Sequence, residues 1–138
     1  GRDYATAPQP VEGALDLMRK MHQAMGDELV LACHDASEGG LAVALAEMAI
    51  GGGYGFNVDL SQALGADALS DAEAAFSESI ARFVVEVSSE NRDAFEAVFG
   101  DTCRHIGQTA NDDSTCIYVG KDGESIFSLA DLRQAWLS

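Results

Sequence analysis

Polar and apolar residues follow helical spacing in some parts of the chain and strand spacing in others, which predicts a mixture of α-helices and β-strands. Near the N-terminus, one stripe recurs at helical spacing, polar residues occupy the other side, and Gly26 is placed to end the helix. The stripe consists of Val11, Leu15, Met18, His22 and Met25. We expect its methionines to fill the core.

The next segment has a different pattern. Residues 29–32 are all apolar, which is typical of an interior strand. Polar residues then arrive together, a glycine pair follows, and residues 41–50 carry only one charge, at Glu47. Such a run predicts a helix that is covered on more than one face.

Later segments continue the alternation. We expect strands at residues 56–60, 83–87, 103–106, 115–119 and 125–127, a loop with a short helix at 61–75, and a helix that ends before Gly100. The final helix presents Leu129, Leu132 and Trp136 as a stripe, and we expect Trp136 in the core. The predicted fold class is α+β or α/β, a two-layer sandwich of helices on a mixed β-sheet. Residues 1–9 read as an arm or linker and residues 10–138 as a single domain.

The turn before the apolar helix combines glycines with carboxylates. Free N–H groups at a helix start favour an anion, and Gly39 and Gly40 permit close backbone approach. Asp35 and Glu38 would repel a bare phosphate in that turn. Because Mg²⁺ binds one or two carboxylates together with phosphate oxygens, the pattern suits a magnesium nucleotide better than free phosphate.

A structural role fits the same residues. Asp35 or Ser37 can cap the helix, Glu38 can sit in its first turn, and His34 can be a hydrogen-bonded structural histidine.

Composition narrows the class of protein. The 138 residues include 23 acidic and 8 basic side chains, for a formal charge of −15, which argues against nucleic acid or an anionic membrane as a partner. No apolar run is long enough to span a bilayer, and no signal peptide is visible, so a cytoplasmic protein is expected. Three cysteines without a zinc-like spacing indicate reduced, buried thiols.

Three segments resemble one enzyme family. HDASEGGLAVALAEMA, from His34, is similar to the signature of the C-terminal half of phosphoribosylformylglycinamidine synthase. FSESIAR, from Phe76, resembles that family's F-x-E-S-x-x-R turn, and LADLRQAW, from Leu129, resembles its closing helix. The resemblance implies a fragment of a larger enzyme, with a fold like the C-terminal domain of aminoimidazole ribonucleotide synthetase.

The resemblance also implies a function. In the family, ATP and glutamine-derived ammonia convert formylglycinamide ribonucleotide to formylglycinamidine ribonucleotide in purine biosynthesis. The implied cofactors are ATP or ADP and Mg²⁺, and the implied partners are the remaining domains of the parent chain, a glutaminase subunit and a small bridging subunit. No catalytic residue is expected here, and the fragment alone is expected to be inactive.

The resemblance places candidate site residues in the first two segments. The magnesium candidates are Asp35 and Glu38, and the nucleotide or phosphate candidates are His34, Ser37, Gly39, Gly40, Glu78, Ser79 and Arg82. Arg82 would meet phosphate, brace Glu78, or form a salt bridge at the strand start.

Two alternatives stay open from the sequence. One is a related ATP-dependent enzyme, of the aminoimidazole ribonucleotide synthetase, selenophosphate synthetase or thiamine-monophosphate kinase type. The other is a non-catalytic packing module.

Overall fold

A computed structural model describes residues 12–63, 70–78, 80–110 and 114–138, so the expected arm at residues 1–9 and the candidate Ser79 lie outside the described residues. The helices are α1 (Ala14–Gly26), α2 (Gly40–Gly52), α3 (Asp71–Phe76), α4 (Arg92–Phe99) and α5 (Leu129–Trp136). The strands are β1 (Ala32–Asp35), β2 (Phe56–Asp59), β3 (Phe83–Glu86), β4 (Gly107–Thr109), β5 (Thr115–Val119) and β6 (Glu124–Ser128). Helices packed on mixed strands confirm the expected α+β architecture.

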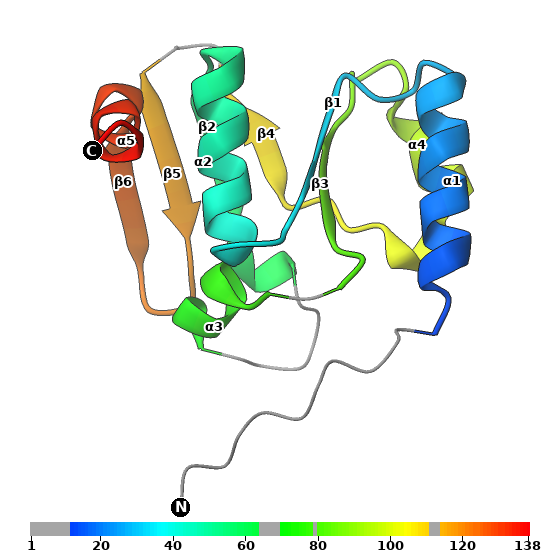
Figure 1. Ribbon diagram of the computed structural model, residues 1–138, viewed down its shortest axis with the longest axis horizontal. Coiled ribbons are helices and arrows are strands. Elements are labelled where there is room, and N and C mark those ends of the chain that lie inside the picture. The colour runs from blue at the N-terminus through cyan, green and yellow to red at the C-terminus, as the bar shows by residue number, and fades with distance from the viewer. Residues whose placement is uncertain (1–11, 64–69, 79, 111–113) are drawn as a thin grey trace, which may run out of the picture.

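The described strands form two sheets. The larger sheet has the order β4-β2-β5-β6, in which β2 and β5 run parallel and the outer pairs run antiparallel. The smaller sheet is an antiparallel ribbon of β1 and β3, with His34 opposite Val84. Figure 1 shows α2 beside the larger sheet and α1 and α4 at the opposite end of the molecule. The ribbon of β1 and β3 lies between α2 and these two helices.

The ribbon separates two apolar clusters. Val84 belongs to the larger cluster, which α2 forms with β2, β5 and the start of α5. Cys33 and Phe83 pack against the smaller cluster of α1 and α4, around Phe95 and Phe99. Because neighbouring strand residues point to opposite faces, the ribbon contributes side chains to both clusters.

Some element boundaries differ from those expected. The strands at 56–60, 83–87, 115–119 and 125–127 are confirmed to within a residue or two, as is the helix that ends before Gly100. The strand expected at 103–106 is wrong, because the chain pairs with β2 only from Gly107. The strand expected from residue 29 is present but begins later, at Ala32, and its expected interior position is wrong at Leu31, which is 63% exposed.

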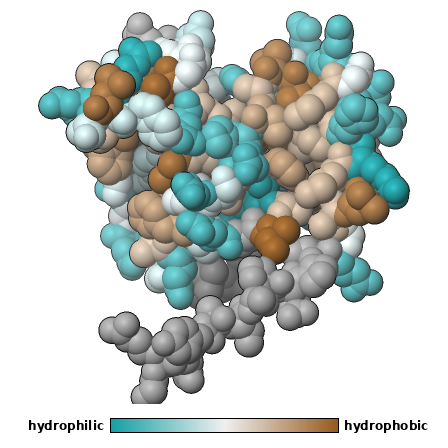
Figure 2. All heavy atoms as spheres, in the orientation of Figure 1, coloured by the Kyte–Doolittle hydropathy of each residue, from teal (hydrophilic) through white to brown (hydrophobic). Residues whose placement is uncertain are grey.

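Two expected buried faces are wrong. α1 buries Met21 and Ala24 against Phe95 and Phe99, which leaves Met18 and Met25 exposed. In α5, Leu129 is buried, but Trp136 is 60% exposed. Figure 2 shows apolar side chains at the surface over both halves of the molecule.

The cysteines agree with the expectation of reduced thiols. Cys116 is buried, and Cys33 and Cys103 are half-buried; all three are free. Burial raises the pKa of each thiol, which keeps it protonated at neutral pH. Within the part of the chain that the structure describes, no helix has the length and apolar character needed to cross a membrane.

Candidate functional site

The turn between β1 and α2 depends on two glycines. Gly39 and Gly40 have φ values of 76° and 66°, a region that favours glycine. A Cβ on Gly40 would lie 2.9 Å from the carbonyl oxygen of Ala75 and 2.7 Å from the carbonyl carbon of Phe76. The end of α3 therefore packs directly on the start of α2.

The carboxylate of Glu78, in the FSESIAR segment, lies at the start of α2. The backbone N–H of Gly39 donates to Glu78 Oε1 at 3.1 Å. Gly39 is the residue before α2 and has no side chain to cap it, and no described hydrogen bond joins the side chain of Asp35 or Ser37 to the first turn. The capping role predicted for Asp35 or Ser37 is therefore wrong. Glu38 lies ahead of the first turn, which holds no acidic residue.

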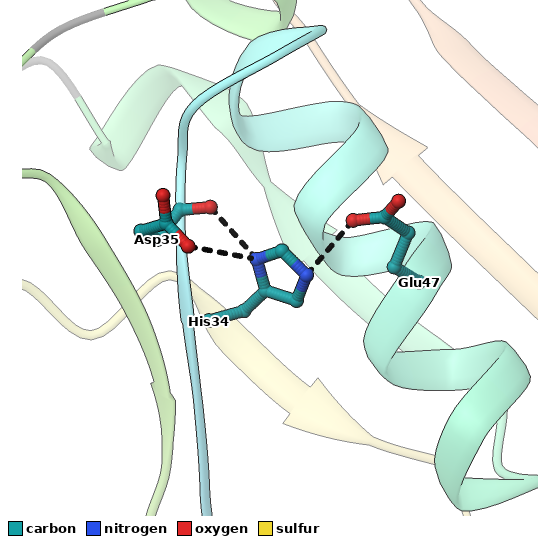
Figure 3. Close-up of polar contacts among 3 residues, drawn as sticks. All are labelled: His34, Asp35 and Glu47. Carbon is teal, nitrogen blue, oxygen red and sulfur yellow. Dashed lines mark hydrogen bonds and ion pairs between the residues drawn. The ribbon is translucent and has the colours of Figure 1, made fainter.

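His34 connects β1 to α2 (Figure 3). Its Nε2 lies 2.8 Å from Glu47 Oε2, and its Nδ1 lies 2.7 Å from the carbonyl oxygen of Asp35 and 3.8 Å from Asp35 Oδ1. Both ring nitrogens face acceptors, and a doubly protonated ring donates to both. These contacts are the ones expected of a hydrogen-bonded structural histidine, which is one of the two roles predicted for His34.

Sequence reasoning missed Glu47 as the partner of His34. The signal was available, because Glu47 is the single charge on an otherwise apolar helix, and a half-buried charge needs a partner.

The side chain of Arg82 forms hydrogen bonds within its own segment, FSESIAR. Its Nη1 donates to Ser77 Oγ at 3.2 Å and is 3.4 Å from the Ser77 carbonyl oxygen. The Arg82 carbonyl accepts from the N–H of Ala36 at 2.9 Å, and burial lowers the pKa of the guanidinium. None of the described ion pairs contains Arg82, so the predicted brace of Glu78 and the predicted salt bridge at the strand start are both wrong.

The candidates therefore divide into two groups. Gly39, Gly40, Glu78 and the Arg82 carbonyl join the two segments, whereas the side chains of His34 and Arg82 each bond within one segment. The side chains of Asp35, Ser37 and Glu38 are exposed at the outside of the turn. No three metal-ligating side chains converge anywhere among the residues that the structure describes, so a cation here would be held by these two carboxylates at most.

Comparisons with known proteins identify the family of this chain. Residues 3–120 match the family model of the AIR synthase related protein, C-terminal domain. This chain belongs to that family. The match spans both motif segments that meet at Gly39 and Glu78.

Two named relatives match most of this chain. The chain is 39% identical over 132 residues to the phosphoribosylformylglycinamidine synthase subunit PurL of Thermococcus sibiricus, which covers 96% of this chain and 17% of the relative. It is 36% identical over 121 residues to PurL of Lactobacillus helveticus, covering 88% of this chain and 15% of the relative. The chain thus spans about one-sixth of the length of the relatives it matches.

Solved structures show the same fold. Thermotoga maritima PurL complexed with FGAR superposes with a TM-score of 0.76 at 17% identity, over 95% of this chain and 23% of that one. The same protein complexed with ATP gives a TM-score of 0.74 at 17% identity, over 84% and 21%.

Proposed function

We propose that this chain is the C-terminal domain of a PurL-type phosphoribosylformylglycinamidine synthase. The parent would use ATP and glutamine-derived ammonia to convert formylglycinamide ribonucleotide to formylglycinamidine ribonucleotide, as an ATP-dependent carbon–nitrogen ligase of purine biosynthesis. The observation that carries the proposal is the 39% identity to a PurL subunit over 96% of this chain.

The turn after β1 has a specific part in this proposal. Asp35 and Glu38 would hold Mg²⁺, with Ser37 beside the nucleotide phosphates, because their side chains are exposed at the turn. The magnesium ion would supply charge neutralisation and would complete its coordination with water and phosphate oxygens. Two carboxylates fit such a nucleotide-bound ion, although they do not form a metal site by themselves.

The remaining candidates would act through the turn. The Glu78 carboxylate already accepts from the N–H of Gly39, so a phosphate would compete with it for that donor. His34 and Arg82 likewise donate to groups of this chain. We therefore assign positioning roles to His34, Gly39, Gly40, Glu78 and Arg82, and Ser79 remains a predicted contact.

The proposal includes partners and location. A Thermotoga maritima structure is described as PurLQS, which supports an assembly with a glutaminase subunit and a small bridging subunit. The same protein has been solved with ADP as well as ATP, which supports ATP or ADP as the ligand. A cytoplasmic location follows from the proposed pathway.

A chimera tests the function directly. The 132-residue segment of Thermococcus sibiricus PurL that matches this chain would be replaced by this chain, and the chimera expressed in a purine auxotroph that lacks its own PurL. We expect growth without added purine. A folded, expressed chimera that fails to support growth, beside a Thermococcus protein that succeeds, would overturn the proposal.

A further inference from the structure

The turn between β5 and β6 contains the dipeptide Asp122-Gly123, the one place in the sequence where a glycine follows an aspartate. Both residues are exposed. In such a dipeptide, the backbone nitrogen of the glycine can attack the side-chain carboxyl of the aspartate, because the glycine has no Cβ to obstruct the approach. The proposed function uses neither residue, so the turn is open to a chemistry of its own.

The two groups that would react are free of hydrogen bonds. Within the described part of the chain, no hydrogen bond is accepted by the Asp122 carboxylate and none is donated by the N–H of Gly123. The Gly123 carbonyl, by contrast, accepts from the N–H of Gly120 at 2.8 Å. Apart from its chain neighbours, nothing lies within 4 Å of the position that a Cβ on Gly123 would take. The attacking nitrogen therefore lies in open space.

Asp71, at the start of α3, holds the preceding part of the turn. Its Oδ1 and Oδ2 accept the N–H groups of Lys121 and Asp122, both at 2.8 Å. Figure 1 shows the turn beside α3. These bonds restrain the nitrogen side of Asp122, whereas the attack requires rotation about the bond between its Cα and its carbonyl carbon. Asp71 therefore restricts the movement that the attack needs but leaves both reacting groups unprotected.

We propose that Asp122 converts spontaneously to isoaspartate in the folded protein, at a rate that Asp71 limits. The Gly123 nitrogen loses its proton and bonds to Cγ of Asp122, and a carboxyl oxygen takes up protons and leaves as water. The product of this step is a cyclic succinimide. Water then adds to the main-chain carbonyl carbon of Asp122, and the bond from that carbon to the Gly123 nitrogen breaks. The two steps release one water and consume one, so no atom is gained or lost overall.

The conversion changes the backbone of the turn. The main chain then runs through Cβ and Cγ of Asp122, which lengthens it by one carbon, and the former carbonyl carbon becomes a free carboxylate that keeps the charge. The added carbon lies between the Asp122 N–H that Asp71 holds and the Gly123 carbonyl that accepts from Gly120. Because the turn fits both contacts at its present length, we expect the converted chain to have a lower unfolding midpoint.

Peptide mapping of the folded 138-residue chain tests the proposal. After incubation at physiological temperature and pH, a protease that cleaves after arginine releases residues 105–133 as one peptide. Electron-transfer fragmentation in a mass spectrometer distinguishes isoaspartate from aspartate at each position. Asp131 in the same peptide is the internal control, since a leucine follows it. We expect isoaspartate to accumulate at Asp122 and not at Asp131.

The chain unfolded in urea is the positive control, because its backbone rotates freely at Asp122. Isoaspartate that forms at Asp122 only in the unfolded chain would overturn the proposal. Asp122→Glu keeps the charge but would have to form a larger ring, so this variant should remain unmodified at the position. The measurement needs neither activity nor a ligand, so its outcome does not depend on the proposed function.

A further pair of variants tests the part assigned to Asp71. An amide at this position can accept only one of the two N–H groups, so Asp71→Asn should speed isoaspartate formation at Asp122 at least about threefold. Asp101→Asn removes an exposed carboxylate outside the turn and should leave the rate unchanged. Thermal unfolding shows whether both variants are folded at the incubation temperature. Equal rates in two folded variants would contradict a limit set by Asp71.

Discussion

Glu78 Oε1 accepts a hydrogen bond from the backbone N–H of Gly39, and this contact joins two segments that lie 39 positions apart in the sequence. The two segments are the ones that resemble phosphoribosylformylglycinamidine synthase most closely. An anion at a helix start is favoured by the helix dipole, and here the protein supplies that anion itself. The turn is consequently fixed in shape, with Asp35 and Glu38 exposed at it.

Gly40→Ala should destabilise the domain by about 2–4 kcal/mol, because a methyl group would meet the backbone of Ala75 and Phe76 at a φ that disfavours alanine. Urea unfolding measures the change. The control is Gly51→Ala in the same helix, where nothing lies within 4 Å of the added Cβ. Alanine there should be neutral or stabilise by about 0.5–1 kcal/mol. Similar effects of the two variants would contradict close packing at Gly40.

The sequence predicted elements better than it predicted which faces they bury. In α1, Leu15, Met18 and Met25 share one stripe, but Met21 and Ala24 share another at equally good helical spacing. Spacing cannot choose between two such stripes, since the choice depends on where α4 docks. The tertiary position of α4 also depends on contacts that no local pattern encodes.

The sequence predicted which residues belong to the site better than it predicted which of them contact one another. The motif residues Gly39 and Glu78 were both singled out, yet nothing in either segment states that they touch. His34 was predicted as a possible structural histidine without its partner Glu47, which lies 13 positions later on the next helix. Such pairings require the packing of β1 on α2, which only the fold supplies.

Asp71 should contribute stability that is lost in acid. Its Oδ2 and Oδ1 accept the backbone N–H groups of Asp122 and Lys121, both at 2.8 Å, and these bonds lower the pKa of the carboxyl. A depressed native pKa stabilises the fold above the unfolded pKa, and the contribution disappears as the pH falls through the native pKa.

Asp71→Asn should therefore lower the unfolding midpoint at neutral pH, because an amide can accept only one of the two bonds and has no charge. The difference from the unmodified chain should shrink below about pH 4, near the ordinary pKa of an aspartate. Thermal unfolding across pH measures it, with the exposed Asp101→Asn as the control. A difference that stays constant down to the acid limit would contradict the charge-based explanation.

Asp35→Asn in the parent should weaken magnesium-nucleotide binding at least about tenfold, because the substitution keeps the size of the side chain but removes the charge that a metal requires. Stability should change little, since the pair with His34 is 3.8 Å long and Asp35 is 63% exposed. Calorimetric titration with Mg-ADP measures affinity, and Glu124→Gln on β6 is the control. If affinity stays unchanged while the unfolding midpoint falls by several degrees, Asp35 serves the structure through His34.

Stability should rise with salt. A net charge of −15 on 138 residues gives self-repulsion that is stronger in the compact state than in the unfolded chain. Raising KCl from about 0.01 to 1 M shortens the Debye length from about 30 to 3 Å, which screens that repulsion. The described ion pairs of lysine and arginine are exposed i,i+4 pairs, and their loss should matter little. A flat or falling unfolding midpoint would show that the acidic side chains are already well separated or paired.

The most direct test of the account is the rate of formylglycinamidine ribonucleotide formation by the purified Thermococcus chimera, with formylglycinamide ribonucleotide, ATP, Mg²⁺ and ammonia. We expect the chimera to be active and the 138-residue chain alone to be inactive, because the chain spans only about one-sixth of its relatives and the reacting groups must be held together by several domains. Product formation by the chain alone, or a folded chimera without product, would contradict the account.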